Sequence, residues 1–189
     1  MSASGEAMIC EPIMLKYTPS RKATKNRVKP LETIGIYLMY PDERLQIRYT
    51  YAFDIDKKVT RQRLQQIIET IKKHLKCDIP MICETSKGYH IYISKFWYNP
   101  YKTYAEIMKL RKHVPEFDHL QLKLGFMRLR KIDTWAIIRV GGKYETPDIK
   151  VIYFDPGCIN DLCHRSWIKH VYLLIKLYNE VSQYVDIDH

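Results

Sequence analysis

The chain has 189 residues, of which 46% are hydrophobic and 12% aromatic, so it can bury a core without disulfides or metals. Lys and Arg number 31 against 21 Asp and Glu, and this net charge of +10 favours a polyanionic partner such as nucleic acid or nucleotide. No run of about 18 apolar residues predicts a membrane span, and the first residues do not follow the pattern of a secretory signal. We therefore expect a cytoplasmic location and no membrane partner.

Two regions are expected along the chain. Residues 1–30 form a basic N-terminal arm, and residues 31–189 form a single folded domain. Within the arm, residues 16–29 are rich in Lys and Arg and contain no acid. That composition is found in segments that contact a phosphate backbone, but it is more typical of a solvated, frayed terminus.

After Pro30, β-prone runs alternate with segments of helical spacing. Strands are expected over residues 33–40, 45–56, 79–84, 89–96, 126–132, 135–140 and 149–154. Helices are expected over residues 60–76, 103–113 and 166–184, with Thr60 as one N-cap and Thr103 with Glu106 as a capping box. Gly141 and Gly142 predict a hairpin into the last strand. The class is α+β, with a mixed or antiparallel sheet flanked by helices.

Two acids close the second strand, in Phe53-Asp54-Ile55-Asp56. Alternate side chains of a strand share a face, so Asp54 and Asp56 are expected to point the same way. Two carboxylates held together repel each other unless a cation bridges them, and hard oxygen ligands suit Mg²⁺ or Mn²⁺. A second Asp-x-Asp, Asp186 and Asp188, is interpreted as part of a solvated tail.

A second motif follows the first predicted helix. Ser86, Lys87 and Gly88 form a small-residue turn between two strands, and His90 begins the second of them. Gly88 permits close approach of another backbone, and Ser86 and Lys87 can donate to phosphate oxygens.

Together the two motifs resemble the archaeo-eukaryotic primase superfamily, over roughly residues 45–140. That family carries a strand-borne Asp-x-Asp, a Ser/Gly-rich turn followed by His, and a third acid. Here Asp118 fits the third acid best, with Arg130 as its downstream basic residue. Asp133, followed by Arg139, is the alternative. The sequence departs from the family in lacking the second Gly of the turn, a loss that Lys87 could offset.

The resemblance implies a primase-type catalytic core with an RRM-like sheet and template-directed nucleotidyl transfer in DNA replication. Asp54, Asp56 and Asp118 would bind Mg²⁺ or Mn²⁺ and carry the catalysis. Ser86, Lys87, Gly88, His90 and Arg130 would bind the nucleoside triphosphate. Single-stranded DNA would be the template, and a replicative helicase or large primase subunit would be a further partner. The basic stretch Lys102–Lys131 and the tyrosines at 98, 101 and 104 could form the template groove.

The five cysteines are an odd number without a signal, so we expect reduced thiols. Cys158, Cys163 and His164, with His170 beyond them, match no common zinc spacing, and no zinc is expected there.

Three other functions stay open. A non-catalytic single-stranded nucleic-acid-binding module of RRM-like fold would need neither Asp54 nor Asp56. A rolling-circle endonuclease would need two histidines around one hydrophobic residue, and the His90 motif offers one. A repair polymerase of the same superfamily would share every site residue with a primase.

Overall fold

The computed structural model describes residues 10–16, 33–142 and 149–185, and its fold is α+β with antiparallel sheets, as expected. Residues 10–16, assigned to the basic arm on sequence, belong to the fold. The strands are β1 Met14–Lys16, β2 Ile34–Tyr37, β3 Met39–Pro41, β4 Ile47–Tyr49, β5 Ala52–Ile55, β6 Met81–Thr85, β7 Tyr89–Tyr92, β8 Ile137–Gly141 and β9 Ile149–Phe154. The helices are α1 Arg61–Leu75, α2 Pro100–Lys109, α3 His119–Ile132 and α4 Leu162–Val185.

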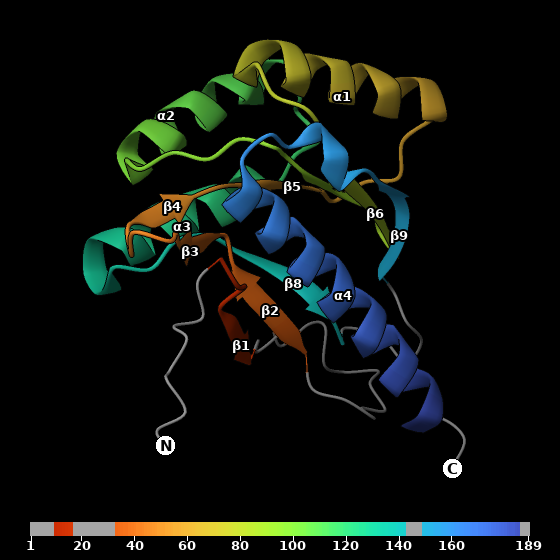
Figure 1. Ribbon diagram of the computed structural model, residues 1–189. Helices are drawn as coiled ribbons and strands as arrows, with labels where there is room; N and C mark the ends of the chain where they lie inside the picture. Colours follow the sequence, from red (N-terminus) through yellow and green to blue (C-terminus); the bar gives the residue numbers. More distant parts are fainter. Residues whose placement is uncertain (1–9, 17–32, 143–148, 186–189) are drawn as a thin grey trace, which may run out of the picture.

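The largest sheet has four strands in the order β5-β7-β6-β9, with every pair antiparallel. The helix α1 connects β5 to β6, and β7 returns to lie between them, which is a split β-α-β arrangement. Figure 1 shows α1 and α2 above this sheet. The sheet departs from the RRM pattern at its fourth strand, because β9 pairs with β6 at the edge away from β5.

A second sheet, β1-β2-β8, and a separate hairpin, β3-β4, complete the strands. The predicted strand 33–40 is broken at Leu38, whose amide donates to Ala136 while its carbonyl accepts from Thr50. The predicted strand 45–56 is likewise divided into β4 and β5. In each run the residue pattern shows no break, but the two halves belong to different sheets.

The predicted helix 60–76 is confirmed. Thr60 accepts from the Arg63 amide as N-cap, and Lys76 ends the helix in a left-handed conformation with φ 51°. The residues expected to form its apolar stripe are buried or partly buried, which places that face on the core: Leu64, Ile67, Ile68, Ile71 and Leu75.

The chain between residues 99 and 132 differs from the prediction. The second helix is capped by Asn99 with Pro100 in its first turn, and Thr103 lies inside it. Glu106 therefore closes no capping box and instead accepts from the indole of Trp97 at 3.0 Å. Residues 126–132 form the end of α3 and no strand. The helix buries Leu122, Gly125 and Leu129, a spacing near 3.6 residues that the alternation of apolar and basic residues over 127–130 concealed.

The predicted hairpin at Gly141-Gly142 is wrong. The strand β8 pairs with β2, whereas β9 pairs with β6 in the other sheet. The closing helix is confirmed as α4, which begins earlier than expected and contacts both β8 and β9 (Figure 1). It therefore joins the two sheets. Among the residues that the structure describes, no helix combines the length and apolar character that crossing a bilayer requires.

Candidate active site around Asp54 and His90

Asp54 and His90 lie directly opposite each other on the paired strands β5 and β7. The His90 Nε2 atom is 3.7 Å from the Asp54 Oδ1 atom. The His90 side chain is buried and the Asp54 side chain is 27% exposed, so the carboxylate stands between the imidazole and solvent. A histidine beside a carboxylate can orient it and, when protonated, stabilise its charge.

Asp118 reaches the same strand from a distant part of the sequence. Its amide donates to the Asp54 carbonyl oxygen at 2.7 Å, and the preceding Phe117 forms a bridge with Ile55. Phe117 is buried and packs edge-on against Phe53, with ring centroids 5.4 Å apart. Asp118 also accepts from the Leu120 amide as the N-cap of α3. The third acid and the first amides of a helix therefore lie beside Asp54.

The alternative third acid lies elsewhere. Asp133 ends α3 in a left-handed conformation with φ 51°. The 14 residues of α3 span about 21 Å, so the helix separates Asp133 from Asp118. Arg130 lies exposed in the last turn of the same helix, and it is likewise remote from Asp118.

Asp56 follows β5 and is exposed. No three His, Cys, Asp or Glu groups that include Asp54, Asp56 or Asp118 bring their ligand atoms within 4.8 Å of one another in the described part of the chain. The backbone thus joins Asp54 to Asp118, while the expected trio of carboxylates is not assembled at ligand spacing. The backbones of Asp54 and Asp118 meet through one hydrogen bond, whereas Asp56 is exposed beyond the end of β5.

The turn before His90 lies against the Asp-x-Asp segment. A Cβ atom on Gly88 would overlap the carbonyl oxygen of Ile55 and would stand 2.8 Å from the Lys57 amide nitrogen. Gly88 is therefore required by the approach of the residue 55–57 backbone. Ser86 and Lys87 are exposed at the tip of this turn, where they can reach a ligand in solvent.

Two buried phenols adjoin these acids, and the sequence analysis assigned them no role. The hydroxyls of Tyr51 and Tyr92 have no hydrogen-bond partner within the described ranges. Burial raises the pKa of both phenols, and the Asp54 charge raises the pKa of both further. Asp118 has the same effect on the pKa of Tyr51. The positive charge of Arg139, on β8, acts in the opposite direction and lowers the pKa of Tyr92.

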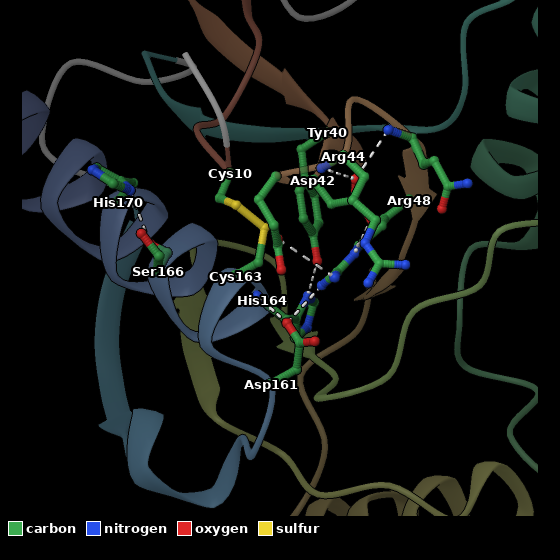
Figure 2. Close-up of a disulfide and its surroundings, with 12 residues drawn as sticks. Cys10, Tyr40, Asp42, Arg44, Arg48, Asp161, Cys163, His164, Ser166 and His170 are labelled. Carbon is green, nitrogen blue, oxygen red and sulfur yellow. Dashed lines mark hydrogen bonds and ion pairs between the residues drawn. A yellow bond between two sulfur atoms is a disulfide. The ribbon is translucent and has the colours of Figure 1, made fainter. Parts of the chain in front are cut away.

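A second polar cluster lies where α4 begins (Figure 2). The Arg48 guanidinium contacts Asp42 and Asp161, and the Tyr40 hydroxyl is 2.5 Å from Nδ1 of His164. The other nitrogen of His164 is 3.0 Å from the Ile93 carbonyl, so it donates and Nδ1 accepts. Burial lowers the pKa of His164 to about 4.

The expectation of five reduced cysteines is wrong for one pair. Cys10 and Cys163 form a disulfide with Cα atoms 5.4 Å apart, a separation typical of such bonds. Their 153-residue separation in sequence gave no local sign of the pairing. Cys163 is bonded to Cys10, and both ring nitrogens of His164 are engaged by other groups.

The expected template groove falls on α2 and α3. Seven of its eight Lys and Arg residues are exposed, and Arg128 is partly buried. Tyr101 is 55% exposed, whereas Tyr104 stacks on Phe126 with centroids 4.3 Å apart. Tyr98 donates to Asp42 and so belongs to the cluster around Arg48.

No protein-family model matches the chain, and no curated protein or solved structure matches it either.

Proposed function

We propose that the protein is a metal-dependent nucleotidyltransferase, a DNA primase or primase-polymerase. The observation that carries this proposal is the gathering of Asp54, His90 and Asp118 from three separate elements. The same three residue types were expected together because of their resemblance to primase motifs. The proposal thus rests on the agreement between a sequence motif and a backbone arrangement that the motif does not dictate.

Asp54 and Asp118 would hold Mg²⁺ or Mn²⁺, with Asp56 as a further ligand. The bound ions would polarise a 3′ hydroxyl and neutralise the triphosphate. The buried His90 side chain would fix the orientation of the Asp54 carboxylate. Ser86 and Lys87 would donate to phosphate oxygens from the tip of their turn. Arg130 lies in the last turn of α3, at the end away from Asp118, so the proposal assigns it no phosphate contact.

Single-stranded DNA would bind along the outer surface of α2 and α3. Exposed Lys109 ends α2, exposed Arg111 and Lys112 follow it, and Lys123 and Lys131 are exposed on α3. Cations in such an array release counterions from a phosphate backbone. Exposed Tyr101 offers a face on which a base can stack.

The decisive experiment is Mn²⁺-dependent primer synthesis on single-stranded DNA by the wild type and two matched variants. Asp54→Asn removes one charge from the site, and Asp78→Asn removes one from an exposed loop. We expect synthesis to fall at least about 100-fold in Asp54→Asn and to be unchanged in Asp78→Asn. Equal synthesis by the two variants would overturn the proposal.

The second candidate is a non-catalytic single-stranded nucleic-acid-binding module. The exposed cations of α2 and α3 favour it, because they need no metal. Stacking of bases on the sheet, as in RRM domains, does not support this candidate. The sheet residues Phe53, Ile91 and Tyr92 are all buried and cannot meet a base. Binding of single strands without any Mn²⁺-dependent nucleotide binding would select this function.

A further inference from the structure

Cys10, Glu43 and Cys163 come from three separate parts of the chain and meet at one place. Cys10 precedes β1, Glu43 lies in the turn between β3 and β4, and Cys163 lies in the first turn of α4. Two sulfurs and a carboxylate oxygen of these residues lie within 4.8 Å of one another. Across residues 10–16, 33–142 and 149–185, no other three His, Cys, Asp or Glu groups meet that spacing.

The donor set matches the chemistry of zinc. Thiolates are soft ligands that select Zn²⁺, and a carboxylate oxygen commonly completes such sites. With Zn–S bonds of about 2.3 Å, the sulfurs of a tetrahedral site lie about 3.8 Å apart. Cysteines whose Cα atoms are 5.4 Å apart can direct both sulfurs to one ion. The Glu43 side chain is 66% exposed, so solvent can supply a fourth ligand.

The surroundings favour a cation at this point. The single guanidinium of Arg48 contacts three carboxylates, at 3.3 Å from Asp42, 2.5 Å from Asp161 and 3.9 Å from Glu43. Glu43 is the most distant of the three, and it is therefore the one most readily turned to another cation. Cys163 lies at the N-terminus of a 24-residue helix, where the unpaired amides favour a thiolate.

We propose that Cys10, Cys163 and Glu43 bind one Zn²⁺ ion when the two cysteines are reduced, and that the disulfide in Figure 2 is the oxidised form of the same site. In either form the site fastens the segment before β1 to the start of α4. This site is separate from Asp54 and His90, and it does not depend on the proposed catalysis.

The two forms exchange by a balanced two-electron step. A dithiol reductant gives two electrons and two protons to the Cys10–Cys163 disulfide and becomes a disulfide itself. The two thiols then release their protons to solvent as two Zn–S bonds form. In the reverse direction, a small-molecule disulfide takes two electrons from the two thiolates, and Zn²⁺ leaves as the protein disulfide forms.

Zinc titration of the full-length, reduced protein against a coloured chelator tests this inference. We expect one Zn²⁺ per chain, and Co²⁺ in its place should give a thiolate-to-metal charge-transfer band. Glutathione disulfide should then expel the metal. Failure of the reduced wild type to bind one Zn²⁺ would overturn the proposal and leave a disulfide alone.

Matched variants assign the ligands. Cys10→Ser and Cys163→Ser should each weaken zinc binding at least about 100-fold, and Glu43→Gln about tenfold. Because Glu43 is exposed, that variant is expected to keep the fold. The control is Cys77→Ser with Cys158→Ser, which changes two unbonded cysteines. Zinc binding that survives Cys163→Ser, or that is lost in the control, would contradict the assignment.

Discussion

Asp118 donates its amide to the carbonyl of Asp54, and this bond places the start of α3 beside β5. Asp133 lies at the other end of the same helix. The two acids that the sequence offered as alternatives are thus held about 21 Å apart by one rigid element.

This separation allows a paired test. Asp118→Asn removes a charge next to Asp54 but keeps an N-cap acceptor for α3, and Asp133→Asn keeps a residue tolerant of the left-handed conformation. We expect Mn²⁺-dependent synthesis to fall at least about 100-fold in Asp118→Asn and to stay within about twofold of wild type in Asp133→Asn. Thermal unfolding should show both variants folded. The reverse ranking would assign the third acid to Asp133.

Gly88 provides a test of the turn before His90. In Gly88→Ala the new Cβ atom meets the backbone at Ile55 and Lys57, which cannot yield as a side chain can. We expect a loss of about 2–3 kcal/mol in the free energy of unfolding, typical of overpacking. Gly157→Ala is the control, since its nearest neighbour is an Asp155 carboxylate oxygen at 3.2 Å. Urea unfolding that ranks the two variants equally would contradict this account of Gly88.

The ion pair of Arg63 and Glu116 predicts a pH dependence. Arg63 of α1 contacts Glu116 at 2.5 and 2.9 Å, and this hydrogen bonding holds the pKa of Glu116 below its usual range. The Glu116 carboxylate therefore binds a proton less readily in the folded state than in the unfolded state. The resulting stability is complete above the ordinary glutamate pKa of about 4.3 and is lost as the pH falls through the lower folded value.

We expect Glu116→Gln to lose about 1 kcal/mol at pH 7, since Arg63 is partly solvated, and to match the wild type in strong acid. Urea unfolding at both pH values measures this difference. Glu69→Gln, at an exposed position of α1, should change stability little at either pH. If Glu116→Gln lowers the free energy of unfolding as much in acid as at neutral pH, the loss comes from altered packing and not from the ion pair.

Reduction of the disulfide should destabilise the fold. The chain-entropy relation for a separation of 153 residues gives about 5 kcal/mol, and native disulfides commonly contribute about 2–5 kcal/mol. We expect Cys10→Ser with Cys163→Ser to lose stability within this range in the presence of a chelator. A reductant should lower the melting temperature of the wild type but not of that double variant. If the reductant lowers the melting temperature of both proteins equally, loss of the Cys10–Cys163 disulfide is not the cause.

The sequence by itself determined the elements whose causes are local. Thr60 and the apolar stripe of α1 could be predicted because capping and helical spacing act within a few residues. The β6–β7 turn with Gly88 was found for the same reason, whereas His90 and Asp54 share a face of the sheet because the β5–β7 register sets them directly opposite each other. The end of α3 was predicted as a strand because apolar and basic residues alternate over 127–130, although Leu, Met, Arg and Lys all favour a helix.

Only the tertiary structure decided which distant residues meet. It brought Asp118 to Asp54 and paired Cys10 with Cys163. Each of these contacts depends on how whole helices and strands pack, and packing energy is spread over a buried core rather than written into a short segment. A sequence pattern therefore predicts which residue types a site needs. The packed fold decides which of several residues of that type lies at the site.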